Sequence, residues 1–224
     1  MAAEYKVFDL SFSSPAGIGT HLERHHDRIR MFFRRSFGFV EAGPFTPEPQ
    51  TLIAQINRKP LKGVLIARLA PLPGSSSEEE IKKDYFNAFS LSYDFADAFS
   101  VEVTSRNIDY LHDILDSILG IRVCYDSYKP VLVKVSPSLS DTSLKEIIDY
   151  SRMSGIDGVI SERVKTIYDY TAGRFPIIAC GAFKSPEEAR NALNDGASLV
   201  MLEDVRPTFN FVKKTNRLLE DSKK

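Results

Sequence analysis

The chain is poor in the features that mark extracellular, membrane and nucleic-acid-binding proteins. Its 224 residues include only two cysteines, Cys124 and Cys180, without the short spacing of a metal motif. Lysine and arginine total 29 against 30 acidic residues, so a net charge of −1 gives no general attraction to nucleic acid. No run approaches the ~18 apolar residues of a membrane span, and no apolar signal-peptide core follows the first residue. We therefore expect a soluble cytoplasmic protein with free thiols, no membrane span and no nucleic-acid partner.

No internal repeat, low-complexity linker or break in composition divides the sequence, so we expect one domain over residues 1–224. What the chain does have is a series of short apolar runs rich in β-forming residues. Most are continuously apolar rather than alternating, which is typical of parallel strands covered on both faces. Seven are clear and an eighth, at 15–19, is weaker; the clear ones are 37–43, 62–70, 98–104, 130–137, 158–161, 175–182 and 198–203.

Helical patterns separate these runs. Residues 75–95 open with serine cap candidates and glutamates that suit the helix dipole. Residues 138–155 carry apolar positions at helical spacing and end on a glycine. Pro186 takes the favoured first-turn position of a helix over 185–197, and a last helix is expected at about 208–221.

Eight strands alternating with helices predict an α/β fold, a single (β/α)8 TIM barrel with trimmed loops. The alternative is a doubly wound open sheet, whose first strand should lead into a glycine-rich phosphate turn. The stretch "GIGTHLER" (17–24) is a poor version of that turn, so the barrel is favoured. In such a barrel the functional residues follow the carboxyl ends of the strands.

Several segments, in order along the chain, resemble the dihydroorotate dehydrogenase family, and its membrane-linked class in particular. "SFGFVEAGPFTPEPQ" (36–50) is similar to GFGFVEVGTVTPxPQ, and "PVLVKVSPSLSDTSLKEII" (130–148) is similar to PVLVKxxPDLSDExLxxI. "FDLSFSSPAGIG" (8–19), "GIDGVI" (155–160) and "FPIIACGAFKSPEEARNALNDGASLVML" (175–202) continue the match. The resemblance implies a barrel that binds flavin mononucleotide (FMN) and oxidises dihydroorotate in pyrimidine biosynthesis, as a divergent and shortened member.

The resemblance also implies roles for individual residues. Ser105 matches the catalytic base, Asn107 a substrate-contacting asparagine, and Lys134 a lysine that stabilises the reduced flavin. Arg24 stands where the family has a substrate-site lysine. Gly181 and Ala182 stand where the family holds the flavin phosphate with a Gly-Gly pair.

Other positions depart from the family pattern. The asparagines expected in strands three, four and six are matched to Leu65, Glu102 and Arg163. After the last strand, Glu203, Asp204 and Val205 stand where the family has Tyr-Ser/Thr-Gly near the expected phosphate, which a carboxylate would repel. We expect FMN from the family but predict that it is not bound here, and we expect no metal.

The same residues have plainer interpretations. Ser105 caps a helix that starts near Asn107. Lys134, inside an apolar strand, pairs with Glu102 or Glu203 to fill the flavin site; a nucleophilic Schiff-base lysine is the other reading, which those carboxylates oppose. His21 and His25 have the spacing of a metal pair, but no third ligand is evident.

Three functional hypotheses follow, and they leave open whether the protein is an enzyme. The favoured one is a pseudoenzyme with eroded flavin and orotate sites, acting as a regulatory subunit or as the partner of a protein such as an active paralogue, in an unknown oligomeric state. The alternative is an active FMN-dependent oxidoreductase that uses Ser105, Asn107 and Lys134. The third is a barrel repurposed to bind another small ligand, for which the acidic mouth favours a cation or an amine.

Overall fold

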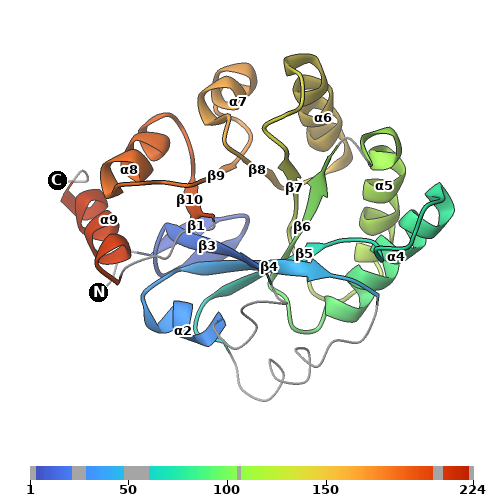
Figure 1. Ribbon diagram of the computed structural model, residues 1–224, viewed down its shortest axis with the longest axis horizontal. Helices are drawn as coiled ribbons and strands as arrows, with labels where there is room; N and C mark the ends of the chain where they lie inside the picture. Colours follow the sequence, from blue (N-terminus) through green and yellow to red (C-terminus); the bar gives the residue numbers. More distant parts are fainter. Residues whose placement is uncertain (1–3, 22–28, 48–60, 105–106, 204–208, 222–224) are drawn as a thin grey trace.

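The computed structural model describes residues 4–21, 29–47, 61–104, 107–203 and 209–221. Eight parallel strands close into a barrel in the order β10-β3-β4-β5-β6-β7-β8-β9, and the helices form a ring around them (Figure 1). The predicted (β/α)8 barrel is confirmed. The strands are β3 (Ala16–His21), β4 (Phe39–Phe45), β5 (Val64–Leu69), β6 (Ala98–Val103), β7 (Val131–Val135), β8 (Gly158–Ser161), β9 (Ile177–Gly181) and β10 (Leu199–Leu202).

The helices begin and end largely where their capping residues place them. Ser77 and Glu80 form a reciprocal capping box at the start of α4. Ser140 caps α6, which ends at Gly155 in the left-handed conformation, and Ser185 precedes Pro186 at the start of α8. The elements are α2 (Ile29–Arg34), α4 (Glu78–Ser92), η2 (Ile108–Tyr110), α5 (Leu111–Arg122), α6 (Asp141–Ser154), α7 (Val164–Thr171), α8 (Pro186–Asn194) and α9 (Phe209–Asp221).

A β-hairpin absent from the sequence prediction covers the amino-terminal end of the barrel. It consists of β1 (Tyr5–Val7) and β2 (Leu10–Phe12), which pair antiparallel. Phe12 is fully buried among the inward side chains at the starts of the strands, where it meets the ring of Phe39 edge-on at 5.7 Å. With this end packed by apolar side chains, polar chemistry is confined to the opposite end, the mouth of the barrel.

Alternation along each strand divides the side chains into two sets. Outward residues such as Leu65 and Val133 pack against the helices, and inward residues such as Ile66 and Leu132 fill the barrel. Both cysteines are free; Cys180 is buried and Cys124 is exposed. Within the ranges given above, no helix is long and apolar enough to cross a membrane.

Candidate functional site

Lys134 lies at the centre of the barrel mouth. It is an inward residue of β7, and its ammonium contacts two carboxylates from distant strands. Lys134 Nζ is 3.0 Å from Glu41 Oε2 on β4 and 2.5 Å from Glu203 Oε1 at the end of β10. This triad therefore links β4, β7 and β10 across the interior rather than along the sheet.

Glu41 is the buried member of the triad, with 2% of its surface exposed. Ser100 Oγ donates to Glu41 Oε1 at 2.8 Å, so both carboxylate oxygens have partners. Burial favours the neutral acid, but the charges of Lys134 and Arg68 outweigh it and hold the pKa of the Glu41 carboxyl below its usual value. Glu41 is thus a fixed negative charge inside the barrel.

The two carboxylates also determine the state of Lys134. Burial alone would lower the pKa of the ammonium, but Glu41 and Glu203 together raise it above the usual value. A lysine held cationic in this way is not a nucleophilic amine at neutral pH. The geometry therefore argues against the Schiff-base alternative.

The expected Lys134–Glu102 pair is wrong. Glu102 and Lys134 are register neighbours on β6 and β7, yet Glu102 turns toward β5, where its Oε2 accepts from Arg68 Nη1 at 2.8 Å. The other expected partner, Glu203, is confirmed. Lys134 pairs with Glu41 and Glu203 across the barrel, while Arg68 pairs with Glu102. The mouth therefore holds two neighbouring ionic clusters.

Leu65, which was matched to the asparagine expected in strand three, does not face the mouth. It is fully buried on the outward side of β5. Arg68, three residues further on, is the inward residue at the mouth, with 11% of its side chain exposed. An offset of three moves a strand residue to the opposite face, which explains why the two positions differ so completely.

Sequence reasoning missed Glu41 and Ser100, and it placed Arg68 at the end of its strand without giving it a role. A signal was present for the two charged residues. Glu41 and Arg68 are charged residues within otherwise apolar strands, and such residues are rarely buried unless they have a partner. Ser100 gives no such signal, because a serine in a strand is compatible with either face.

Asn107 ties the loop after β6 together. Its Oδ1 accepts from the Thr104 amide at 2.8 Å, and its Nδ2 donates to the Glu102 carbonyl at 2.7 Å and to Tyr85 Oη at 3.1 Å. Burial, above all, raises the pKa of Tyr85 to about 12, so the phenol keeps its proton. The substrate-contacting role of Asn107 stays a prediction, since a substrate would have to compete with these bonds.

We expect Asn107→Ala to lower the free energy of unfolding by about 2 kcal/mol, because it leaves buried loop groups without partners. Urea unfolding followed by circular dichroism measures the loss. Tyr85→Phe is the matched control, since it removes only the bond from Asn107 Nδ2 to Tyr85 Oη and should cost about 1 kcal/mol. If Asn107→Ala changes stability by less than about 0.5 kcal/mol, its hydrogen bonds do not hold the loop.

The end of β9 carries the expected phosphate-binding residues. Gly181 has a φ of 152°, which favours glycine, and a Cβ there would meet nothing within 4 Å. Ala182 is exposed. The Lys184 amide, at the start of the next helix, donates to Glu188 Oε2 at 2.7 Å. One backbone donor that a phosphate could use here is therefore already bonded to a carboxylate.

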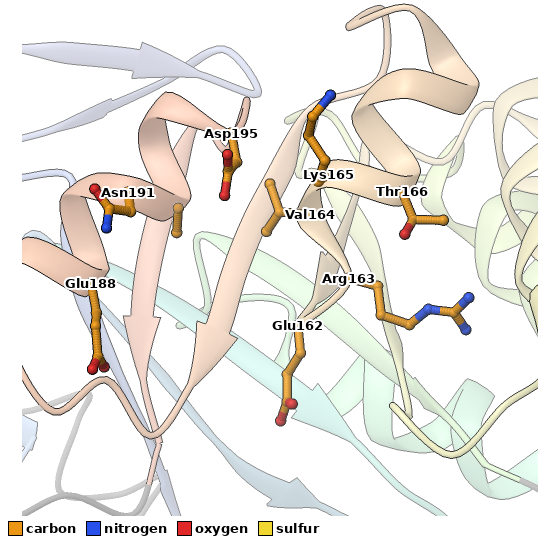
Figure 2. A pocket seen from close by; sticks show the side chains of 9 residues that line it. Glu162, Arg163, Val164, Lys165, Thr166, Glu188, Asn191 and Asp195 are labelled. Carbon is orange, nitrogen blue, oxygen red and sulfur yellow. The ribbon is translucent and has the colours of Figure 1, made fainter.

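A groove of about 400 Å³ lies beside this loop, between α7 and α8. Figure 2 shows Glu162 and Arg163 pointing in different directions from the end of β8. Arg163 Nη1 donates to the Leu139 carbonyl at 2.9 Å and Nη2 pairs with Asp141, so this side chain braces the start of α6. The groove is lined by Glu162, Arg163, Val164, Lys165, Thr166, Glu188, Asn191, Ala192 and Asp195.

Some predicted site residues lie outside the described ranges. They include Ser105, expected as base or helix cap, and Arg24, expected near the substrate. Asp204 and His25 also lie there, and the side chain of His21 is not described. Among the residues that are described, no group of three or more His, Cys, Asp or Glu side chains could hold a metal ion.

Comparison with known proteins gives consistent relatives. No family model matches the chain. A quinone-type dihydroorotate dehydrogenase of Salinispora arenicola is 27% identical over 271 aligned positions, covering 90% of this chain and 79% of the relative. That alignment is longer than the 224-residue chain, so this chain lacks segments that the relative has. The corresponding Christiangramia forsetii protein is 25% identical, covering 89% and 78%.

Solved structures show the same fold. The crystal structure of DHODH from Eimeria tenella in complex with ferulenol matches 98% of this chain, with a TM-score of 0.79 and 18% identity, and 85% of that chain is covered. The ligand-free type from the same organism gives a TM-score of 0.77 at 17% identity, covering 97% and 84%.

Proposed function

We propose that this divergent relative of the quinone-type dihydroorotate dehydrogenases is a pseudoenzyme, a barrel that has exchanged flavin chemistry for an internal ionic network. The observation that carries the proposal is the position of Lys134, held between Glu41 and Glu203 at 3.0 and 2.5 Å. The resemblance assigns this lysine to a flavin. Here its charge is matched, and exceeded, by side chains of the chain itself.

The described residues do not fit FMN. The cofactor carries a phosphate dianion, which needs free backbone donors and no negative charge nearby. Between β9 and α8, the Lys184 amide is bonded to Glu188 instead. Each carboxylate about 4 Å from a phosphate charge would oppose binding by about 1 to 4 kcal/mol, depending on the local dielectric. We therefore derive no catalytic step through a flavin.

The orotate side of the mouth supports the same conclusion. An amide can offer both a donor and an acceptor to a planar polar ring, whereas a charged side chain offers only one kind of group. Glu102 and Arg68 are bonded to each other, and Arg163 is bonded to the loop before α6. Glu102 and Arg163, which stand where the resemblance implies amides, therefore already have bonding partners within the chain.

The absorption spectrum of the purified protein tests the proposal. We expect no flavin band near 450 nm, no retention of FMN after incubation with excess cofactor and gel filtration, and no turnover of dihydroorotate with a quinone. An active quinone-type relative purified in parallel controls for flavin supply and assay conditions. Stoichiometric flavin with turnover that a Ser105→Ala variant abolishes would establish the active-enzyme alternative.

A pseudoenzyme acts through binding, and we propose a protein partner, with an active dihydroorotate dehydrogenase of the same cell as the first candidate. Light scattering after gel filtration of the two proteins, separately and mixed, measures whether they associate. A mixture that elutes as the sum of its components, with unchanged activity of the enzyme, would remove this candidate.

A further inference from the structure

The two carboxylates that hold Lys134 differ in character. Glu41 is 2% exposed and is bonded to Ser100 as well, so it is part of the barrel interior. The Glu203 side chain is 31% exposed and comes from the residue directly after β10. One counterion is built into the core, and the other reaches the lysine from the rim.

Glu203 nevertheless lies inside the mouth. A Cβ placed on Gly19 would be 3.6 Å from Glu203 Cγ and 3.5 Å from Glu41 Oε2. Both carboxylates thus pass over Gly19 to the same ammonium. A methyl group at this position would lie in ordinary van der Waals contact with both side chains, so the two carboxylates pack closely over the backbone of β3.

Within the two described clusters, charge neutrality does not require Glu203. Glu41 already balances Lys134, and Glu102 balances Arg68. Glu203 adds a third carboxylate to these two cations, an excess of one negative charge among the described residues of the clusters. The Glu203 carboxylate contacts Lys134 although the lysine already has Glu41 as its partner. It therefore occupies the place beside the ammonium where an anionic group of a ligand would bind.

We infer that Lys134 forms an anion-binding site and that the carboxylate of Glu203, a residue of the same chain, occupies this site. The inference rests on the proposed function. Without the Glu203 side chain, the site would bind a small monocarboxylate about the size of the glutamate head group. A ligand of this class enters the wild-type mouth only by displacing Glu203.

The test removes the tethered carboxylate and supplies a free one. Glu203→Ala is titrated with sodium acetate while its thermal midpoint is measured, with sodium chloride holding ionic strength constant. Acetate at tenfold its dissociation constant should raise the midpoint by about 3–6 °C, in a saturable way. The wild type, Glu146→Ala (an exposed carboxylate on α6), and Glu203→Ala/Lys134→Met should show no saturable rise.

Each outcome has its own meaning. No rise in Glu203→Ala, with the wild type flavin-free, overturns this inference and leaves the proposed function standing. A rise that survives in the double variant overturns the assignment to Lys134. A flavin-loaded wild type overturns the proposed function first. If Glu203→Ala does not fold, Glu203→Ser, which keeps one polar atom, is titrated in the same way and judged by the same result.

Discussion

Lys134→Met should lower the free energy of unfolding by about 3–5 kcal/mol, the cost of leaving a buried charge without its partner. The charge is Glu41, whose pKa is held down largely by this lysine and which is 2% exposed. Methionine keeps most of the volume of the lysine stem, so the loss reports electrostatics rather than a cavity. Urea unfolding at neutral pH measures it.

A double-mutant cycle separates the pair from its surroundings. In Lys134→Met/Glu41→Gln no full charge remains unpaired at the Glu41 position, so the double variant should be more stable than Lys134→Met alone. Glu203→Gln alone should cost only about 0–1 kcal/mol, because its side chain is partly exposed and Lys134 keeps Glu41. Strictly additive losses at Lys134 and Glu41 would show that the two residues do not stabilise each other.

The same variant has a predicted pH dependence. A carboxyl whose folded-state pKa is depressed contributes stability above its unfolded-state pKa, and that stability disappears as the pH falls through the folded-state value. For Glu41 the ordinary value is 4.5 and the folded-state value lies lower. In Lys134→Met the lysine no longer offsets burial, so the pKa of Glu41 rises above its ordinary value. The stability difference between wild type and Lys134→Met should therefore begin to shrink above pH 4.5 as the pH falls, and should go on shrinking until Glu41 is protonated in the wild type as well. If the difference in unfolding free energy between the two proteins stays constant down to acid pH, the loss in Lys134→Met comes from packing rather than from charge.

The barrel was predictable from sequence because its strands are nearly continuous apolar runs. Even the weak candidate at 15–19 corresponds to β3. The hairpin of β1 and β2 was not predictable, because its strands have three residues each and its turn places Phe8, a bulky residue that rarely adopts positive φ, beside Asp9.

The presence of ion pairs in the mouth was predictable, but the partners in each pair were not. A lysine within an apolar strand requires a counterion, which predicts a pair with Glu203 or Glu102. Strand register alone favours Glu102, which is the neighbour of Lys134. Side chains inside a barrel also reach across it, so Glu41, Glu102 and Glu203 are all possible partners of Lys134. Their positions in the sequence do not show which of them is closest to the ammonium. The face on which Leu65 lies was also not predicted, because a nearly continuous apolar strand does not reveal which of its residues point inward.

Glycine at position 38 should be among the least replaceable residues in the chain. It directly precedes β4, and its amide donates to the Ala16 carbonyl at 2.9 Å. A Cβ on Gly38 would lie 2.0 Å from the Ser14 carbonyl oxygen and 2.8 Å from the Ser14 amide nitrogen. Such contacts involve backbone rather than a flexible side chain, so they cannot be relieved by a rotamer change.

Ser14 itself cannot withdraw easily. It is 1% exposed; its hydroxyl donates to Asn216 Oδ1 of α9 at 2.7 Å and accepts from the Ala16 amide at 3.1 Å. Gly38→Ala must therefore shift the start of β4, which carries Glu41, or break the contact with α9. We expect a loss of about 3 kcal/mol or more in the free energy of unfolding.

Gly120→Ala is the matched control for Gly38→Ala. Gly120 is an exposed residue of α5, and a Cβ there would meet nothing within 4 Å. Alanine should stabilise this helix by up to about 1 kcal/mol, because glycine loses more backbone entropy on folding. The same substitution should thus have opposite signs at the two positions in urea unfolding. If both variants lose stability equally, close packing against Ser14 does not explain the glycine at position 38.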